Sequence, residues 1–119
     1  MTVDERNFRD VNLNLLVVFA VLMRERSTTR AAERLLLSQP AVSHSLKRLR
    51  AFFGDELFTR VSQGLVPTAY AQRLYEDLLP SLRSIELTLS AHGSTARNSK
   101  SALSAAGLAS VSSLSATTR

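Results

Sequence analysis

The sequence predicts a mainly α-helical domain with one short β-hairpin. Along four segments of the 119-residue chain, apolar residues recur at intervals of three and four, as they do on the buried face of a helix. Side chains that cap helices precede these segments, and two short β-prone stretches, LFTRV and GLVPT, flank a turn. A chain of this length has room for one domain, with at most a small appendage.

The first predicted helix begins after Asn12, whose side chain suits an N-cap, and ends at the charged triplet RER of residues 24–26. It contains the almost wholly apolar stretch LNLLVVFAVLM, which predicts a largely buried helix. This stretch is too short to span a bilayer, so we expect no membrane association. The apolar row at helical spacing comprises Leu13, Leu16, Val17, Ala20 and Met23.

The second predicted helix is short and begins where Ser27, Thr28 and Thr29 offer capping oxygens. In its sequence, RAAERLLL, the charged residues are spaced to face away from the apolar ones. We expect an apolar side made of Ala31, Ala32, Leu35 and Leu36, with Arg30, Glu33 and Arg34 opposite.

The third predicted helix covers roughly residues 39–53. Ser38 is its candidate N-cap, Pro40 lies in the first turn, where a helix tolerates proline best, and Gly54 is a stop. Because so few residues separate it from the second helix, the pair predicts a helix-turn-helix. Its apolar face comprises Ala41, Val42, Leu46, Leu49 and Phe53.

Positive charge is concentrated in these two helices. The whole chain has a formal net charge of +5, but between Thr28 and Phe53 five basic residues stand against one acid, Glu33. A basic half-domain indicates a polyanionic partner. The alternative is that the charge merely keeps a small protein soluble.

After GDEL, the two β-prone stretches predict a hairpin, with Gly64 available for a positive φ. A fourth helix, capped by Thr68, is predicted over residues 69–91, and Pro80 should kink it. Residues 92–119 are rich in Ser and Ala and contain no acidic or aromatic residue, which predicts a disordered tail. The apolar row of the fourth helix comprises Ala71, Leu74, Leu78, Leu82, Ile85 and Leu89.

No residue pattern indicates catalysis or a cofactor. The chain has no cysteine, and its two histidines, His44 and His92, cannot form a metal site by themselves. Ser43 and His44 are adjacent, so on a helix their side chains diverge and cannot act as nucleophile and base. We therefore expect a protein that is not an enzyme, with no metal and no cofactor. The lack of cysteine favours a cytoplasmic location.

The segment LNLLVVFAVLMRERSTTRAAERLLLSQPAVSHSLKRLRAFFGDELFTRVSQGLVPTAYA resembles the N-terminal DNA-binding domain of LysR-type transcriptional regulators. The motifs TRAAERL, LSQPAVSHSLKRLR and GDELF carry the resemblance, which is greatest to the subgroup of salicylate-type and nodulation regulators. It implies an N-terminal arm at 1–10 and a winged helix-turn-helix domain at 11–68. It also implies a linker helix at 69–91, which would pair with that of a second copy through its apolar row.

A helix presented by a tight turn can enter the DNA major groove while its partner helix crosses the backbone. The Gln39 amide can bond adenine with two hydrogen bonds, and Ser43 can donate or accept. In the resembled family, arginine is common at the position of His44. The predicted DNA-binding residues are Thr28, Thr29, Arg30, Ser38, Gln39, Pro40, Ser43, His44, Lys47, Arg48, Arg60 and Thr68.

Some of these assignments compete with simpler ones. The hydroxyls and amides at 28–30 suit a phosphate, but helix capping alone would also explain them. Arg60 is placed to follow the DNA backbone or enter the minor groove, or it is a solvated strand charge.

Members of the family continue into an effector domain, which this sequence does not contain. It therefore resembles a truncated or frameshifted member, or an isolated domain, with no inducer site of its own. The sequence predicts a homodimeric regulator that binds double-stranded DNA. The alternative is a protein-interaction module that has lost DNA binding and acts by pairing with full-length relatives.

Overall fold

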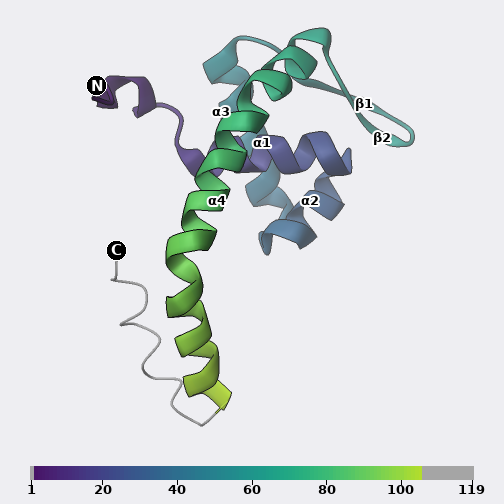
Figure 1. The fold of residues 1–119 in the computed structure, drawn as a ribbon. Helices are drawn as coiled ribbons and strands as arrows, with labels where there is room; N and C mark the ends of the chain where they lie inside the picture. The colour runs from purple at the N-terminus through teal and green to yellow at the C-terminus, as the bar shows by residue number, and fades with distance from the viewer. Residues whose placement is uncertain (1, 106–119) are drawn as a thin grey trace. The chain divides into compact units, whose positions relative to one another are not determined.

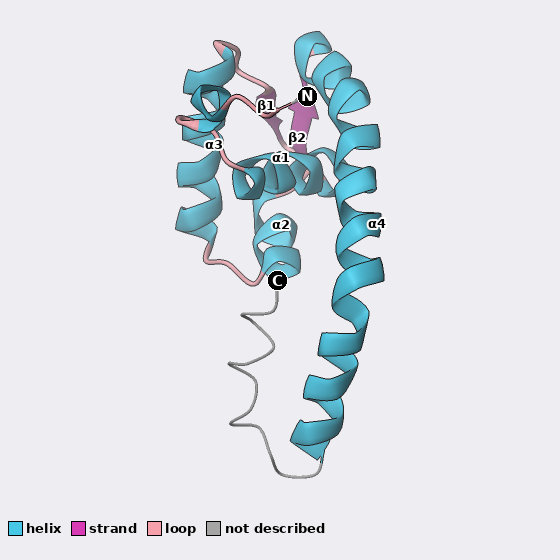
Figure 2. Cartoon of the chain, turned by 60° about the vertical axis from the view of Figure 1, so that its left-hand side comes forward, coloured by secondary structure: helices cyan, strands magenta, loops and turns pink. Residues whose placement is uncertain are grey.

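The computed structural model describes the backbone of residues 2–105 and the side chains of residues 2–93. Helices dominate these residues, together with one two-stranded antiparallel sheet (Figures 1 and 2). The predicted winged helix-turn-helix followed by a long fourth helix is confirmed. In chain order the elements are the 3₁₀ helix η1 (Glu5–Phe8), α1 (Leu13–Glu25), α2 (Thr28–Leu35), α3 (Gln39–Phe53), β1 (Phe58–Val61), β2 (Gly64–Pro67) and α4 (Ala69–Ala105).

A side-chain oxygen caps the start of each α-helix by accepting a hydrogen bond from the backbone amide three residues ahead. The donor–acceptor distances are 2.9 Å at Asn12, 3.1 Å at Ser27, 3.2 Å at Ser38 and 3.0 Å at Thr68. Of the three hydroxyl residues 27–29, Ser27 is thus the cap, and Thr28 and Thr29 are the first residues of α2. The caps predicted for the other three helices are confirmed.

Three helices end at residues in the left-handed region, Arg26 and Leu36 with φ of 57° and Gly54 with φ of 65°. Glycine adopts this conformation without a steric penalty, so the predicted stop of α3 is confirmed. Arg26 lacks that freedom, but its Nε donates a hydrogen bond of 2.6 Å to the carbonyl of Met23. This bond satisfies a carbonyl of the last turn of α1.

The core of residues 2–79 lies where α1, α2 and α3 pack against one another and against the base of the hairpin. Phe19 of α1 is completely buried, and its ring centroid lies 6.0 Å from that of Phe58 and 6.4 Å from that of Tyr75. Burial of a large apolar side chain contributes roughly 1.5–3 kcal/mol. This aromatic cluster therefore fixes both the hairpin and the start of α4 on α1.

The buried face of α1 differs from the predicted one. Leu13 and Val17 are 39% and 37% exposed, whereas Leu15, Val18 and Val21 are buried. Because α1 is apolar on nearly all sides, the spacing of its residues could not identify the face that the other helices cover.

The hairpin forms a wing that extends beyond the helices in Figure 1. Its strands pair with Thr59 opposite Val66 and Arg60 opposite Leu65. Gly64, at the start of β2, has φ of 132°, which confirms the predicted positive φ. The inward residues Phe58 and Leu65 are buried, so one side of the wing packs on the core and the other is open to solvent.

Helix α4 continues through Pro80 to Ala105, beyond the predicted end at residue 91. Between Pro80 and Ala105 the sequence contains no second proline that would break the helix. The helix was predicted to end early because the residues after 91 include few that could form a core, but a helix can form without such residues. The chain divides into two compact units between Leu79 and Pro80. The remainder of the predicted tail, residues 106–119, lies outside the described residues. No helix within the described range is long and apolar enough to cross a membrane.

The N-terminal arm contains η1, and none of its described residues, 2–10, is buried. Asp4 caps this short helix by accepting from the Arg6 amide at 3.0 Å, and its other carboxylate oxygen lies 2.9 Å from the Arg6 guanidinium. Hydrogen bonding between the two side chains lowers the pKa of Asp4 and raises the pKa of Arg6. Since both groups are exposed, the pair contributes little to stability.

Candidate nucleic-acid interface

Three residues join α2 to α3, beginning with Leu36 in the left-handed conformation, φ of 57°. The Leu37 amide donates to the Ala32 carbonyl at 2.9 Å, and the Leu36 amide donates to the Glu33 carbonyl at 3.3 Å. This pair of bonds closes α2 as a Schellman motif, so that α3 can begin almost at once. The Leu36 side chain is consequently 92% exposed, and its predicted place on the apolar side of α2 is wrong.

Helix α3 has one buried face and one solvent-exposed face. Val42, Leu46 and Leu49 are buried in the core, as the spacing predicted. The opposite face contains polar, imidazole and cationic groups and no carboxylate. Its exposed residues include Gln39, Pro40, Ser43, His44, Lys47 and Arg48.

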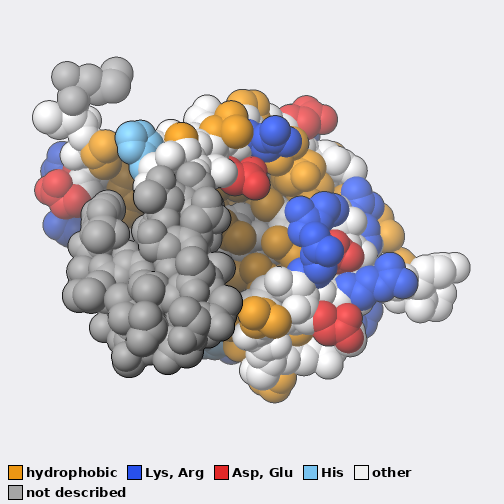
Figure 3. Space-filling model, turned by 60° about the horizontal axis from the view of Figure 1, so that its bottom comes forward, with side chains coloured by type: hydrophobic (Ala, Val, Ile, Leu, Met, Phe, Trp, Pro, Cys, Tyr) orange, Lys and Arg blue, Asp and Glu red, His pale blue; other side chains and the backbone are white. Residues whose placement is uncertain are grey.

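Four of the cations predicted to bind DNA are exposed and form no ion pair with any described residue. Figure 3 shows Lys and Arg side chains gathered on one side of the view, with single acidic side chains among them. One arginine of the helix-turn-helix has an acidic partner, because Arg34 of α2 lies 3.8 Å from Glu25. The four cations without such a partner are Arg30, Lys47, Arg48 and Arg60.

The N-termini of α2 and α3 are joined by a hydrogen bond between side chains. Gln39 Nε2 donates to Thr28 Oγ1 at 3.3 Å, and Thr28 is only 5% exposed. The Thr28 side chain is therefore not available for a direct contact with DNA, and we remove it from the predicted contacts. Its neighbours Thr29 and Arg30 are exposed.

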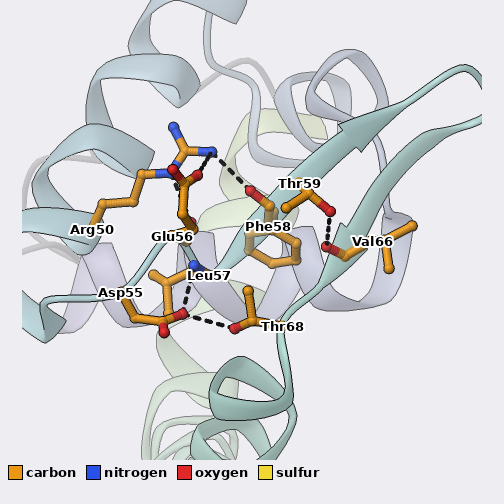
Figure 4. A network of polar contacts seen from close by, with 8 residues as sticks. All are labelled: Arg50, Asp55, Glu56, Leu57, Phe58, Thr59, Val66 and Thr68. Carbon is orange, nitrogen blue, oxygen red and sulfur yellow. Dashed lines mark hydrogen bonds and ion pairs between the residues drawn. The ribbon is translucent and has the colours of Figure 1, made fainter.

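Arg50 has a structural role that sequence reasoning did not identify. Its Nε donates to the carbonyl of Glu56 at 2.7 Å and its Nη2 to the carbonyl of Phe58 at 3.1 Å (Figure 4). The guanidinium thereby ties the last turns of α3 to the first residue of the wing. From the sequence, Arg50 was predicted only to add to the charge of the basic half-domain. No sequence motif indicates that a guanidinium will bond to backbone carbonyls of the loop that follows its helix.

Thr68 was expected to contact DNA, but its hydroxyl is engaged within the fold. It donates to Asp55 Oδ2 at 2.7 Å (Figure 4), and it accepts from the Ala71 amide at 3.0 Å. The same carboxylate oxygen accepts from the Leu57 amide at 2.8 Å, where the backbone takes a left-handed turn, φ of 66°. Thr68 therefore connects the two ends of the wing, and we remove it as well from the predicted contacts.

The apolar row of α4 is not uniform along the helix. Ala71 is completely buried in the core of its own chain and cannot serve a seam with a second copy. Leu74 and Leu78 are partly buried against that same core. Beyond Pro80, Ile85 and Leu89 are 40% and 58% exposed. Leu87, 61% exposed, lies outside the predicted row.

No metal-binding cluster of three or more His, Cys, Asp or Glu side chains occurs in the part of the chain that the structure describes. Ser43 and His44 are both exposed, and none of the hydrogen bonds among the described residues joins them. The open face of α3 therefore offers separate polar and cationic groups, suited to contacts along a polyanion.

Parts of several known proteins are similar in sequence to this chain. The family model of bacterial regulatory helix-turn-helix proteins of the lysR family matches residues 13–72. The HTH-type transcriptional activator NagR of Ralstonia sp is 49% identical over 88 residues, which cover 74% of this chain and 29% of NagR. The HTH-type transcriptional regulator LeuO of Escherichia coli strain K12 is 45% identical over 85 residues, 71% of this chain and 27% of LeuO.

Solved structures of transcriptional regulators are also similar to this chain. The BenM DNA-binding domain in complex with catB site 1 DNA is similar with a TM-score of 0.62 and 26% identity, over 67% of this chain and 90% of that one. PA0477 from Pseudomonas aeruginosa, described as a probable transcriptional regulator, gives 0.66 and 40%, over 69% and 28%. The chain spans less than a third of the length of the curated relatives described above. It belongs to the lysR family of bacterial regulatory helix-turn-helix proteins.

Proposed function

We propose that this chain binds double-stranded DNA sequence-specifically, as the DNA-reading part of a bacterial transcriptional regulator. The observation that carries the proposal is the open face of α3, which combines hydrogen-bonding side chains with unpaired cations and has no acid. One α-helix fits the major groove of B-DNA, and the tight turn after α2 presents α3 for such a contact.

The residues of α3 divide into two groups by chemistry. Gln39, Ser43 and His44, in the first turns, would meet base edges, because an amide, a hydroxyl and an imidazole can each hydrogen-bond there. Lys47 and Arg48, one turn further along, would meet phosphates or a base edge. Ser38 and Pro40 would lie at the mouth of the groove and fix how deeply the helix enters.

Two further groups would hold the backbone on either side of α3. Thr29 and Arg30 lie in the first turn of α2, where the helix dipole and a side-chain cation attract a phosphate. Arg60, an exposed residue of β1, would follow the next stretch of backbone or enter the minor groove. These contacts position the protein, whereas those of α3 select the sequence.

The DNA complex formed by the structurally similar BenM domain supports this arrangement. NagR, a transcriptional activator, supports a role in transcription and hence in the bacterial cytoplasm. We assign the chain no catalytic reaction, metal or cofactor.

We further propose a homodimer joined through α4. Leu82, Ile85 and Leu89, past Pro80, leave apolar surface on one helix row, and burial of a leucine contributes roughly 1.5–3 kcal/mol. Two copies of this row could offset the entropy lost on association, and a dimer would hold two half-sites at once. A chain that only dimerises, without DNA binding, would not require the unpaired cations of α3.

A salt titration tests DNA binding. The affinity of the full chain for a random-sequence duplex should fall linearly on a log–log plot against salt, with a slope of about −0.9 per phosphate contact. A duplex isolated by repeated selection from a random library should bind about 10³-fold tighter than the random duplex, or better, at physiological salt. If the chain binds the random and the selected duplex equally weakly, and salt does not change the affinity, the proposal is contradicted. Such a result would favour the alternative, a protein-interaction module that does not bind DNA.

A further inference from the structure

The contact between Thr28 and Gln39 joins a buried hydroxyl to a candidate base-reading amide. Thr28 is 5% exposed, whereas Gln39 lies at the exposed start of α3. The 3.3 Å bond from Gln39 Nε2 to Thr28 Oγ1 crosses from one helix of the helix-turn-helix to the other.

A glutamine amide can read adenine only in one orientation. It must present a donor to N7 and its carbonyl oxygen to the N6 amino group. The amide nitrogen carries two protons, so one can bond Thr28 while the other remains free beside the carbonyl oxygen. A freely turning amide would present donor and acceptor in either order.

We propose that Thr28 is a positioning residue that fixes the Gln39 amide for an A·T base pair, an inference that rests on the proposed function. A buried hydroxyl is unfavourable unless it is hydrogen-bonded, and valine would fill the same volume without that need. The hydroxyl of Thr28 therefore contributes orientation to Gln39 and not packing to the core. Fixing the amide before DNA arrives also lowers the entropy lost on binding.

The test selects duplexes from a random-sequence library with the 119-residue chain and compares the base preferences of variants by sequencing. The wild type should enrich an A·T pair at one position of each half-site. Thr28→Val should weaken the preference there by about two- to fivefold, whereas Thr28→Ser should keep it, because serine retains the hydroxyl. In a Gln39→Ala background, Thr28→Val should change nothing further.

The control is Thr59→Val, which removes an exposed hydroxyl from β1, where it bonds only the carbonyl of Val66. It should leave the base preference at that position unchanged. Equal changes in Thr59→Val and Thr28→Val would overturn the inference, as would a Thr28→Val effect that persists without Gln39. If Gln39→Ala alters the preference and a folded Thr28→Val does not, the inference fails and the proposed function stands. If the wild type enriches no sequence, both fail.

A measurement on the free wild-type chain needs no variant to fold. In nuclear magnetic resonance spectra, one side-chain amide proton of Gln39 should shift less with temperature than those of Gln72, whose exposed amide forms no side-chain hydrogen bond within the described residues. Identical temperature dependence of the two glutamines would overturn the inference.

Discussion

The amide of Leu65, in the wing, donates a hydrogen bond of 2.9 Å to the carbonyl of Arg26, at the end of α1. Arg26 is in the left-handed conformation, which turns the chain toward α2. One peptide group thereby fixes the wing beside the segment that leads into the helix-turn-helix. The contact requires a close approach of backbone to backbone, and this approach explains the glycine that precedes Leu65.

Gly64→Ala should lower the free energy of unfolding by about 2 kcal/mol or more. A Cβ at this position would lie 2.4 Å from the Arg26 carbonyl oxygen, and φ of 132° is unsuited to alanine. Urea denaturation followed by circular dichroism measures the change. The matched control is Gly54→Ala, where the added Cβ would meet nothing within 4 Å and only the left-handed φ is unfavourable, at a cost of about 1 kcal/mol. Equal losses in the two variants would contradict the proposed backbone contact.

Arg48→Ala should weaken DNA binding, whereas Arg50→Ala should lower stability, although the two arginines lie on one helix. Arg48 forms no ion pair with a described residue, so its loss should reduce the salt slope of DNA binding by about 1 and leave unfolding nearly unchanged. Arg50 bonds two carbonyls, so its loss should lower the free energy of unfolding by about 1–3 kcal/mol. Fluorescence anisotropy at several salt concentrations, combined with thermal melting, separates the two. A stable Arg50→Ala with weakened DNA binding would reverse the assignment.

Thr68→Val should destabilise the chain by about 1–2 kcal/mol without changing the DNA affinity of the folded protein. The variant loses both the cap on the Ala71 amide and the bond to Asp55. Thr68→Ser should restore most of the stability. If Thr68→Val melts like the wild type and binds DNA less well, Thr68 is a DNA contact after all.

Ile85→Asp combined with Leu89→Asp should dissociate the proposed dimer and leave the helix-turn-helix folded, because both side chains are exposed in the single chain. Sedimentation equilibrium measures the mass, and far-ultraviolet circular dichroism measures the helix content. Leu36→Asp changes a leucine outside α4 that is even more exposed, at 92%, and should leave the dimer intact. A wild-type chain that is monomeric at tens of micromolar would exclude the seam.

The features that the sequence predicted correctly depend on local chemistry. The caps at Asn12, Ser38 and Thr68 and the stop at Gly54 each need only a side chain and the backbone within a few residues. The buried row of α3 was also predictable, because polar residues interrupt it at helical spacing.

The features that the sequence did not predict depend on contacts between elements. The face of α1 is selected by the helices packed on it, since Leu13 and Leu15 are equally apolar. The bond between Thr28 and Gln39 spans eleven positions and two helices, so neither residue reveals its partner. The bond between Thr68 and Asp55 likewise closes only when the wing has folded.

The central claim is that the open face of α3 is the surface that meets DNA. Amide chemical-shift perturbation in the full, ¹⁵N-labelled chain tests it most directly, as duplex DNA enriched from a random library is added at physiological salt. We expect the largest changes at residues 38–48, with smaller ones at Thr29, Arg30 and Arg60. Changes confined to residues 80–93 of α4, or no change on addition of DNA, would contradict the claim.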